Sequence, residues 1–523
     1  MAEIDTILNS YNREDEERHA KEEAKRLELK YINLVGYPFA PDVLAILSED
    51  KSYEFRAVTY LKVEDKVQVA SDQPKNEKLQ AFLKEFGVAA KLTFSVSYCS
   101  KTSIEYALSL YRVLNPKIVE KDVSVTEEAE DKFEEEIKSM GELKDKITKV
   151  STTELLDVVF AGAAKLDASD IHIEPGETNL RIRYRIDGVL QDVTELPMAS
   201  FHNLMSRIKY MAKLKLDITH PQDGRFTIKV FTQDIDIRVA TLPTSYGEAV
   251  VMRLLPKNRD FISLDGLGFS EKALASIKAA IATPQGIIIN TGPTGSGKTT
   301  TLYAILKELN KPGKKIITIE DPIEYRVEGI EQVQIVHEQK SLAGHEDAEA
   351  LASREQTSFL DALKGCMRQD PDILMVGEIR DKETASVALQ AALTGHLVLT
   401  TLHTTNAPAA LARLADMGVE PYLLAGSINL IIGQRLVRKL HTECGGKGCA
   451  VCHNTGFKGR VAIIEVLKPG SEVEKLILEK APLRSFEETA HKLGMETMHE
   501  DGMRKVEQGL TTKEEVDRVT RDE

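Results

Sequence analysis

The segment from Gly286 to Thr301 contains the residue types that bind nucleotide phosphates. Gly292, Gly297, Lys298 and Thr299 fit the phosphate-loop pattern G-x-x-x-x-G-K-[ST]. Glycines let the backbone curl so that successive N–H groups face an anion, the lysine reaches the β- and γ-phosphates, and the threonine hydroxyl binds Mg²⁺. The loop therefore predicts binding of ATP with Mg²⁺. The residues expected to contact the nucleotide are Gly292, Pro293, Thr294, Gly295, Ser296, Gly297, Lys298, Thr299 and Thr300.

The residues on either side of this loop predict the elements that position it. The apolar run Gly286–Ile289 predicts a buried strand that leads in, and Thr299–Leu309 predicts a helix that leads out. The N-terminus of that helix adds partial positive charge at the phosphates. An accidental glycine-rich turn is the alternative, and the order of strand, loop and helix argues against it.

A second apolar strand, within residues 372–381, ends in the carboxylate of Glu378. In phosphate-loop ATPases such a strand lies beside the loop and delivers an acid to Mg²⁺ and to the attacking water. Gly377 stands where an aspartate is usual, so Glu378 is the candidate activator of water. A buried strand with a charged end is the structural alternative, and the phosphate loop upstream favours the functional one.

A third apolar strand, Ile316–Ile319, repeats this design. It is followed by Glu320, Asp321 and Glu324, any of which could orient water or hold a metal-bound water. An acidic turn containing Pro322 explains the same residues without chemistry.

A fourth strand runs from His396 towards a polar cluster that includes His403, within Thr394–Asn406. Such a cluster can sense a γ-phosphate through hydrogen bonds. A single histidine on a strand is more often structural, and His396 fits that description.

Three cysteines and a histidine are spaced as in a metal site. His441 and Cys444 form an H-x-x-C pair, and Cys449 and Cys452 form a C-x-x-C pair. Two such pairs predict a closed, tetrahedral Cys₃His zinc site with a structural role. His453 is an alternative fourth ligand, and three reduced thiols without metal are the alternative to a site.

Composition limits the remaining choices. The 523 residues carry a net charge of −14 and are 42% hydrophobic and 29% charged, which describes a soluble globular protein. The acidic balance argues against a nucleic-acid partner, which requires a basic face. No apolar run reaches the ~18–20 residues of a membrane-spanning helix, so we expect a cytoplasmic protein.

Patterning along the chain divides it into five parts. Residues 1–30 predict a charged helix, 31–115 a small α/β domain for interactions, and 116–150 an acidic linker. Residues 151–258 predict a sheet of alternating strands with one helix, Phe201–Lys213. From residue 259 to 523, strands alternate with helices, which predicts a mostly parallel sheet covered on both faces.

The predicted sheet domain, residues 151–258, is rich in arginine. Arg225, Arg238 and Arg253 would ordinarily form surface salt bridges. A phosphate-loop ATPase also requires positive charge at the γ-phosphate, often from a neighbouring domain or subunit. These three arginines are therefore candidates for that role.

The motifs together closely resemble the secretion ATPases of type II secretion and type IV pilus assembly. Four segments of this chain are similar to motifs of that family. They are Gly292–Tyr303 for the phosphate loop, Thr318–Glu324 for the aspartate box, Arg368–Asp381 for the Walker B region and Thr394–Asn406 for the histidine box. The motifs Ala168–Pro175, Arg183–Gly188 and Pro221–Arg225 also match; the match is strong over about residues 150–470.

The resemblance implies an α/β protein in which a RecA-like P-loop NTPase domain follows a PAS-like α+β domain and a small N-terminal α/β domain. It implies a homohexameric ATPase that powers pilin addition through an inner-membrane platform protein, at the inner face of the cytoplasmic membrane. Arg238 and Arg253 would close onto the phosphates, and Glu378 would activate water with help from Glu320 and Glu324.

Alternatives stay open at this point. A motor for type II secretion or for a DNA-uptake pseudopilus carries the same motifs. A nucleic-acid motor is disfavoured by the acidic net charge. A non-hydrolysing scaffold is disfavoured because the loop lysine and the Walker B acid are both present. Two features depart from the family: a histidine replaces one of four cysteines in the zinc knuckle, residues 441–453, and residues 338–357 form a divergent polar insertion.

Overall fold

The computed structural model describes residues 15–35, 37, 39, 41–114, 143–144, 147, 155–215, 220–230, 233–256, 263–335 and 358–521. The divergent segment 338–357 and most of the acidic linker lie outside this part. The chain divides into two units, Met1–Asn258 and Arg259–Glu523, and each is described by itself. No helix within the described ranges is long and apolar enough to cross a membrane.

The first sheet of unit 1 has three strands, β1 (Ala57–Val63), β2 (Lys66–Ser71) and β3 (Thr93–Tyr98). β2 is central and pairs antiparallel with β1 and parallel with β3. Helices α4 (Glu77–Ala90) and α5 (Lys101–Leu114) contribute to two separate apolar clusters on this sheet. Residues 15–26 are also helical, within the charged segment predicted from sequence.

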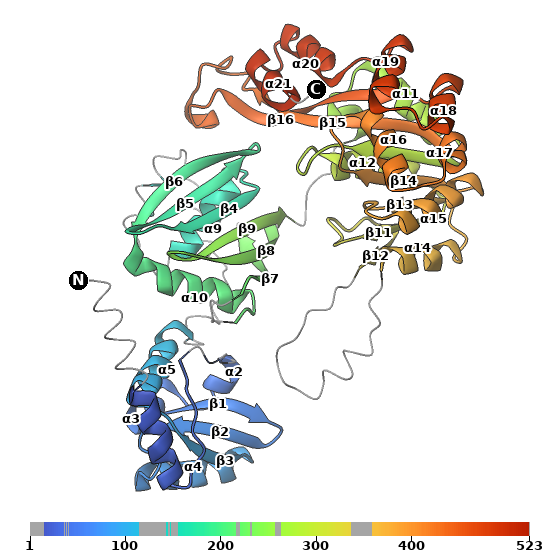
Figure 1. Ribbon diagram of the computed structural model, residues 1–523. Coiled ribbons are helices and arrows are strands. Elements are labelled where there is room, and N and C mark those ends of the chain that lie inside the picture. Colours follow the sequence, from blue (N-terminus) through green and yellow to red (C-terminus); the bar gives the residue numbers. More distant parts are fainter. Residues whose placement is uncertain are drawn as a thin grey trace. The chain divides into compact units, whose positions relative to one another are not determined.

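The second sheet of unit 1 is antiparallel, in the order β6-β5-β4-β9-β8-β7 (Figure 1). Its strands are β4 (Asp170–Pro175), β5 (Asn179–Ile186), β6 (Val189–Pro197), β7 (Gln222–Val230), β8 (Gln233–Thr244) and β9 (Gly247–Pro256). Alternate residues such as Ile182 and Tyr184 are buried against α9 (Leu155–Lys165) and α10 (Phe201–Met211). Successive side chains point to opposite faces of a strand, so the intervening arginines occupy the other face.

Unit 2 is built on a seven-stranded sheet in the order β12-β11-β13-β14-β10-β15-β16. Six strands are parallel and only the edge strand β16 is antiparallel. The strands are β10 (Gly286–Thr291), β11 (Ile316–Glu320), β12 (Glu331–Gln334), β13 (Ile373–Val376), β14 (Leu397–Leu402), β15 (Ile428–Leu440) and β16 (Phe457–Leu467). The predicted strands and the parallel arrangement are confirmed.

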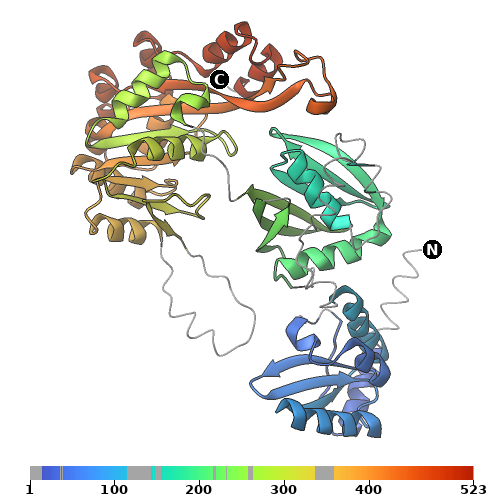
Figure 2. The ribbon, with the colours of Figure 1, turned by 180° about the vertical axis from the view of Figure 1, so that it is seen from behind.

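Helices cover both faces of this sheet (Figures 1 and 2). The side chain of Ile288 joins the core beneath α11 (Glu271–Ile281) and α12 (Lys298–Leu309). Its neighbours Ile287 and Ile289 join the core on the other face. The helices of that second face are α14 (Phe359–Met367), α15 (Lys382–Leu393), α16 (Ala407–Asp416), α17 (Pro421–Ser427), α18 (Ser471–Leu478) and α19 (Leu483–Lys492).

The long pair β15–β16 was not predicted. The apolar run from Tyr422 to Ile432 is helical in α17 and extended at the start of β15. Its apolar residues therefore follow neither the period of a helix nor that of a strand throughout. Two further helices, α20 (Met498–Glu507) and α21 (Lys513–Thr520), pack against this pair. Arg438 of β15 forms an ion pair with Glu515 of α21. In α20, Lys505 donates a hydrogen bond to Ala462 O of β16, and Asp501 accepts one from the N–H of Ile464.

Candidate active site and metal centre

The phosphate loop connects β10 to α12, as the sequence predicts. Gly297 is the residue before α12 and has φ 87°, a conformation that glycine adopts without steric cost. Lys298 is buried, and its Nζ donates hydrogen bonds to the carbonyl oxygens of Gly292 at 2.6 Å and Pro293 at 3.0 Å. The loop therefore already folds around the ammonium that would contact the phosphates.

A buried polar network supports the loop from below. Gln434 of β15 accepts hydrogen bonds from Asn290 Nδ2 at 2.9 Å and from Thr301 Oγ1 at 2.8 Å. It is 1% exposed, so these bonds are not in competition with water. A Cβ at Gly297 would lie 2.8 Å from Gln434 Nε2. Gln434 thus ties the end of β10 and the first turn of α12 to a third element. Sequence reasoning missed it; the signal was a polar residue within an apolar strand.

Glu378 is held at the edge where β13 and β14 end. The residue before it, Gly377, accepts a hydrogen bond from Thr401 Oγ1 at 2.7 Å, and the residue after it, Ile379, donates its N–H to Thr401 O at 3.2 Å. A Cβ at Gly377 would lie 3.1 Å from Ile319 O, closer than side chains normally approach. The missing aspartate is therefore explained by crowding from the neighbouring strand.

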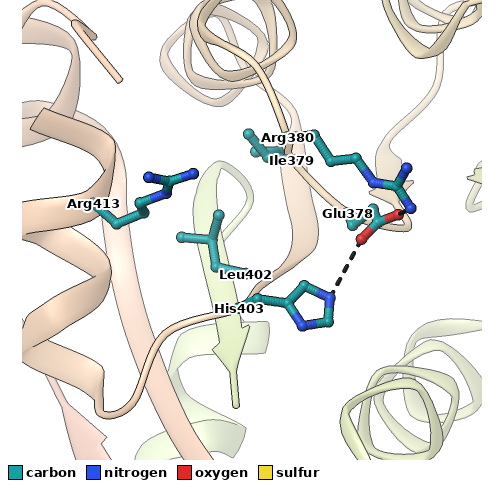
Figure 3. Close-up of a pocket in the computed structure, with 6 residues that line it drawn as sticks. All are labelled: Glu378, Ile379, Arg380, Leu402, His403 and Arg413. Carbon is teal, nitrogen blue, oxygen red and sulfur yellow. Dashed lines mark ion pairs between the residues drawn. The ribbon is translucent and has the colours of Figure 1, made fainter. Parts of the chain in front are cut away.

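Both oxygens of the Glu378 carboxylate have partners in this structure. Arg380 pairs with Oε1, and His403 Nε2 lies 3.3 Å from Oε2 (Figure 3). Glu378 raises the pKa of Arg380 through this hydrogen bond. Burial lowers the pKa of His403, with a further contribution from the charge of Lys298. The predicted residues Glu378, His403 and Lys298 are thus brought together. Arg380, which was not expected from the sequence as a site residue, joins them.

Glu320 lies at the end of β11 but is buried and fully hydrogen-bonded. Its Oε2 accepts from Tyr303 at 2.6 Å, and its Oε1 accepts from Thr318 at 2.6 Å and from Gln332 at 3.2 Å. Burial, with the charges of Glu320 and Glu324, raises the pKa of Tyr303. The structure thus places both carboxylates around Tyr303 of α12, and their assistance to water activation stays a prediction.

The predicted polar cluster after β14 is anchored to the strand that precedes the phosphate loop. Thr404 donates its N–H to Thr291 Oγ1 at 3.0 Å, and the two hydroxyls lie 2.7 Å apart. His396, at the other end of the strand, hydrogen-bonds through Nδ1 to Ala391 O at 3.0 Å. Its contact is with the backbone of the preceding helix, in agreement with a structural role.

The four predicted metal ligands converge. The candidate ligand atoms of His441, Cys444, Cys449 and Cys452 all lie within 4.8 Å of one another. Cys452 Sγ is 3.7 Å from Cys444 Sγ and 3.6 Å from Cys449 Sγ. Two sulfurs about 2.3 Å from one tetrahedral zinc ion would be about 3.8 Å apart, so the spacing fits. His453, the alternative ligand, is not part of the group.

The imidazole of His441 is oriented for this role. Its Nδ1 lies 3.4 Å from Cys449 Sγ, and its Nε2 lies 3.9 Å from a carboxylate oxygen of Glu443. The second distance is longer than a hydrogen bond, so the position of Nδ1 beside the three sulfurs is the observation that supports His441 as a ligand. The site can therefore hold one tetrahedral metal ion.

The candidate arginines form a row across the second sheet of unit 1. Arg225 pairs directly with Arg238, and Arg238 pairs with Arg253 on the adjacent strand. The next position is Asp170, which lies opposite both Arg253 and Arg185. Directly opposed residues share a face. Asp170 is buried and contacts Arg253 Nε at 3.0 Å and Arg185 Nε at 3.5 Å.

Comparison with known proteins decides the family. The sequence profile of the family described as type II/IV secretion system protein matches residues 145–518. The chain belongs to this family. Two relatives illustrate its range: type II secretion system protein HxcR of Pseudomonas aeruginosa is 45% identical over 75% of this chain and 82% of its own length. Type IV pilus assembly ATPase PilB of Myxococcus xanthus is 35% identical over 94% of this chain and 89% of its own.

The fold agrees with this membership. The structure is similar to the ATPase DotB of Legionella pneumophila, with a TM-score of 0.53 and 25% identity over 70% of this chain and 95% of that one. The resemblance to secretion and pilus ATPases is therefore confirmed, and this secretion ATPase is an enzyme that hydrolyses ATP. The predicted α/β fold is confirmed at the level of its sheets and layers.

The buried lysine of this secretion ATPase predicts a pH-dependent affinity for ATP. Burial lowers the pKa of Lys298 to about 8, whereas bound phosphates favour its protonated form. Above pH 8, binding must therefore take up a proton, and Kd should rise by up to about tenfold per pH unit. Calorimetric titration with a non-hydrolysable ATP analogue between pH 7 and 9.5 measures this slope. The slope should disappear in Lys298→Arg, which stays charged; a constant wild-type Kd would contradict the expectation.

Proposed function

We propose that this secretion ATPase drives type IV pilus assembly by hydrolysing ATP. The observation that carries the proposal is the position of Glu378 at the sheet edge: the residues on either side of it bond to Thr401 of β14, and β14 pairs in parallel with β10, the strand that leads into the phosphate loop. Pilus assembly is favoured because the alignment with the pilus ATPase PilB extends over 94% of the chain and includes the N-terminal domain. Type II secretion is the second candidate, favoured by the 45% identity with HxcR.

In the proposed reaction, the phosphate loop and Lys298 bind the β- and γ-phosphates of ATP. Thr299, in the first turn of α12, would hold Mg²⁺, which supplies charge neutralisation at the phosphates when bound. Glu378 accepts a proton from the water that attacks the γ-phosphorus. Each carboxylate oxygen has two lone pairs, so Glu378 can accept this proton while Arg380 and His403 hold its carboxylate in place. We assign assisting roles to His403, Glu320 and Glu324.

Positive charge for the transferred phosphoryl group would come from the arginine row of unit 1. This assignment treats the second sheet as the PAS-like domain, residues 151–258, and unit 2 as the RecA-like domain of a homohexamer. The row is supported as a phosphate contact by its chemistry, since like charges on adjacent strands repel unless an anion lies between them. Arg253 is paired with Asp170, and Arg238 lies in the middle of the row, between Arg225 and Arg253. We take Arg238 as the principal candidate because of this central position, and Arg253 as its partner.

The wider assembly completes the proposal. Closure of the arginine row onto the phosphate loop would convert hydrolysis into domain rotation, and an inner-membrane platform protein would carry this rotation to the pilin subunits. The protein would work at the inner face of the cytoplasmic membrane, without direct contact to nucleic acid. A DNA-stimulated ATPase rate would argue for a nucleic-acid motor instead.

Glu378→Gln should reduce ATP turnover by at least about a hundredfold, because the amide cannot accept the proton of water. Binding of ATP should persist, since the phosphate loop is intact. Steady-state hydrolysis and equilibrium nucleotide binding measure the two effects separately. Glu383→Gln is the matched control, because Glu383 lies in the first turn of α15 and outside the site.

The same variant tests the cellular role. A strain lacking the gene should lose surface pili, and the wild-type copy but not Glu378→Gln should restore them. Retained pili together with lost secretion of extracellular proteins would replace pilus assembly by type II secretion. Full hydrolysis in the purified Glu378→Gln protein would remove the assignment of Glu378.

Arg238→Gln should lower kcat by about a hundredfold or more with a smaller change in KM, because an arginine finger acts mainly in the transition state. Arg181→Gln is the control: Arg181 lies on the same sheet, half exposed, with only surface partners Asp192 and Glu195. Both variants should fold, as circular dichroism can verify. An unchanged kcat in Arg238→Gln would exclude the finger role.

We also propose that the Cys₃His group binds one structural Zn²⁺ per chain. His441→Asn should lose the metal and lower the melting temperature of the protein, since the ion closes the loop between β15 and β16. The matched control His453→Asn should keep it. Metal analysis of purified protein and thermal unfolding with and without chelator provide the measurements. Retention of stoichiometric zinc by His441→Asn would overturn this ligand set.

A further inference from the structure

A cavity of about 450 Å³ lies beside the Glu378 carboxylate. We call it the Arg413 pocket; its lining residues are Glu378, Ile379, Arg380, Leu402, His403 and Arg413. In Figure 3, Arg413 reaches in from α16, Leu402 lies in the middle, and Glu378, Arg380 and His403 lie on the other side. The pocket therefore extends from the candidate reaction centre towards a helix that has no assigned role.

Arg413 is an exposed residue of α16. Among the residues that the structure describes, its guanidinium forms no hydrogen bond or ion pair. An arginine carries five N–H donors in a planar fork that matches the oxygens of a phosphate or carboxylate. The side chain thus presents to the pocket a fixed positive charge and donors that are bonded only to solvent, which an anion can displace.

The remaining groups leave the pocket positively charged. The charges of Arg380 and Glu378 cancel in their ion pair, and His403 has a lowered pKa because of its burial, so it is mainly neutral at pH 7. The charge of Arg413 is therefore uncompensated. Thr404, the residue after His403, donates its N–H to Thr291 Oγ1 at 3.0 Å, so the start of the phosphate loop is tied to the segment that lines the pocket.

We propose that the Arg413 pocket binds the inorganic phosphate that ATP hydrolysis releases. The proposal rests on the proposed reaction at Glu378, which generates a phosphate anion at the entrance of the pocket. Arg413 supplies a charge-assisted pair of hydrogen bonds at the far side, and Arg380 lines the path with the donors that it does not use for Glu378. The phosphate leaves the γ-position by moving along the sheet edge, away from the phosphate loop.

Inhibition of ATP hydrolysis by added inorganic phosphate tests this site. At saturating ATP, competition for the phosphate loop is suppressed, so the remaining inhibition reports phosphate bound to the ADP form. Arg413→Gln should raise the inhibition constant of phosphate by roughly tenfold or more, as expected for the loss of a charged hydrogen-bonding partner. Arg413→Lys, which keeps the charge but loses the fork, should fall between the two.

Arg484→Gln is the matched control, because Arg484 is an exposed helical arginine that pairs only with Glu488 among the described contacts. Inorganic phosphate should inhibit this variant with the same inhibition constant as the wild type. Equal inhibition constants for wild type and Arg413→Gln would overturn the proposal. A change confined to the oligomeric state of Arg413→Gln would also overturn it and would assign the arginine to a carboxylate of a neighbouring copy.

A second measurement separates this proposal from the proposed function. Inorganic phosphate should raise the melting temperature of the ADP-loaded Lys298→Ala protein, whose phosphate loop lacks its lysine, and this shift should vanish when Arg413→Gln is added. The shift requires no turnover. Failure of the wild type to hydrolyse ATP would therefore refute the reaction at Glu378 alone, whereas absence of the shift would refute the pocket alone.

Discussion

The hydrogen bonds between Thr401 and the segment Gly377–Ile379 are the interaction on which the site depends. They join the ends of two parallel strands at the point where Glu378 leaves the sheet. In a parallel sheet the carboxyl ends of all strands meet at one edge, and β10, β11, β13 and β14 each end there. The side chains that follow them, from the phosphate loop to His403, are therefore neighbours although far apart in sequence.

Burial of charge sets the chemistry at this edge. Lys298 is buried with only carbonyl oxygens as hydrogen-bond acceptors, which lowers its pKa and prepares it for a phosphate ligand. Arg380 and His403 hold the Glu378 carboxylate at the sheet edge. The Lys298 ammonium and the Glu378 carboxylate are thus positioned by their neighbours before a substrate binds.

In the proposed reaction, unit 2 supplies only part of the site. The row of Arg225, Arg238 and Arg253 belongs to another unit, built on an antiparallel sheet whose other face is its core. Alternation of side chains along each strand places all three on one surface. In the proposed motor, the separation of the phosphate loop from these arginines is what would make hydrolysis depend on a movement between domains.

Local patterns in the sequence determined the phosphate loop, the strands β10, β11, β13 and β14, the acid Glu378 and the four ligands of the metal group, because each lies within a short motif with its own periodicity or spacing. The family followed from the same motifs. The strands β15 and β16 escaped prediction because consecutive residues in part of each strand are buried, so no alternation along those residues distinguishes strand from helix.

Only the tertiary structure decided the contacts between motifs. It showed that His441, and not His453, faces the three thiols, that Glu320 is enclosed by Tyr303, and that Gln434 and Arg413 come from distant strands and helices to the edge of the site. Such contacts arise from strand order, helix packing and loop conformation, which join residues as far apart in sequence as Asn290 and Gln434. No spacing along the chain records them.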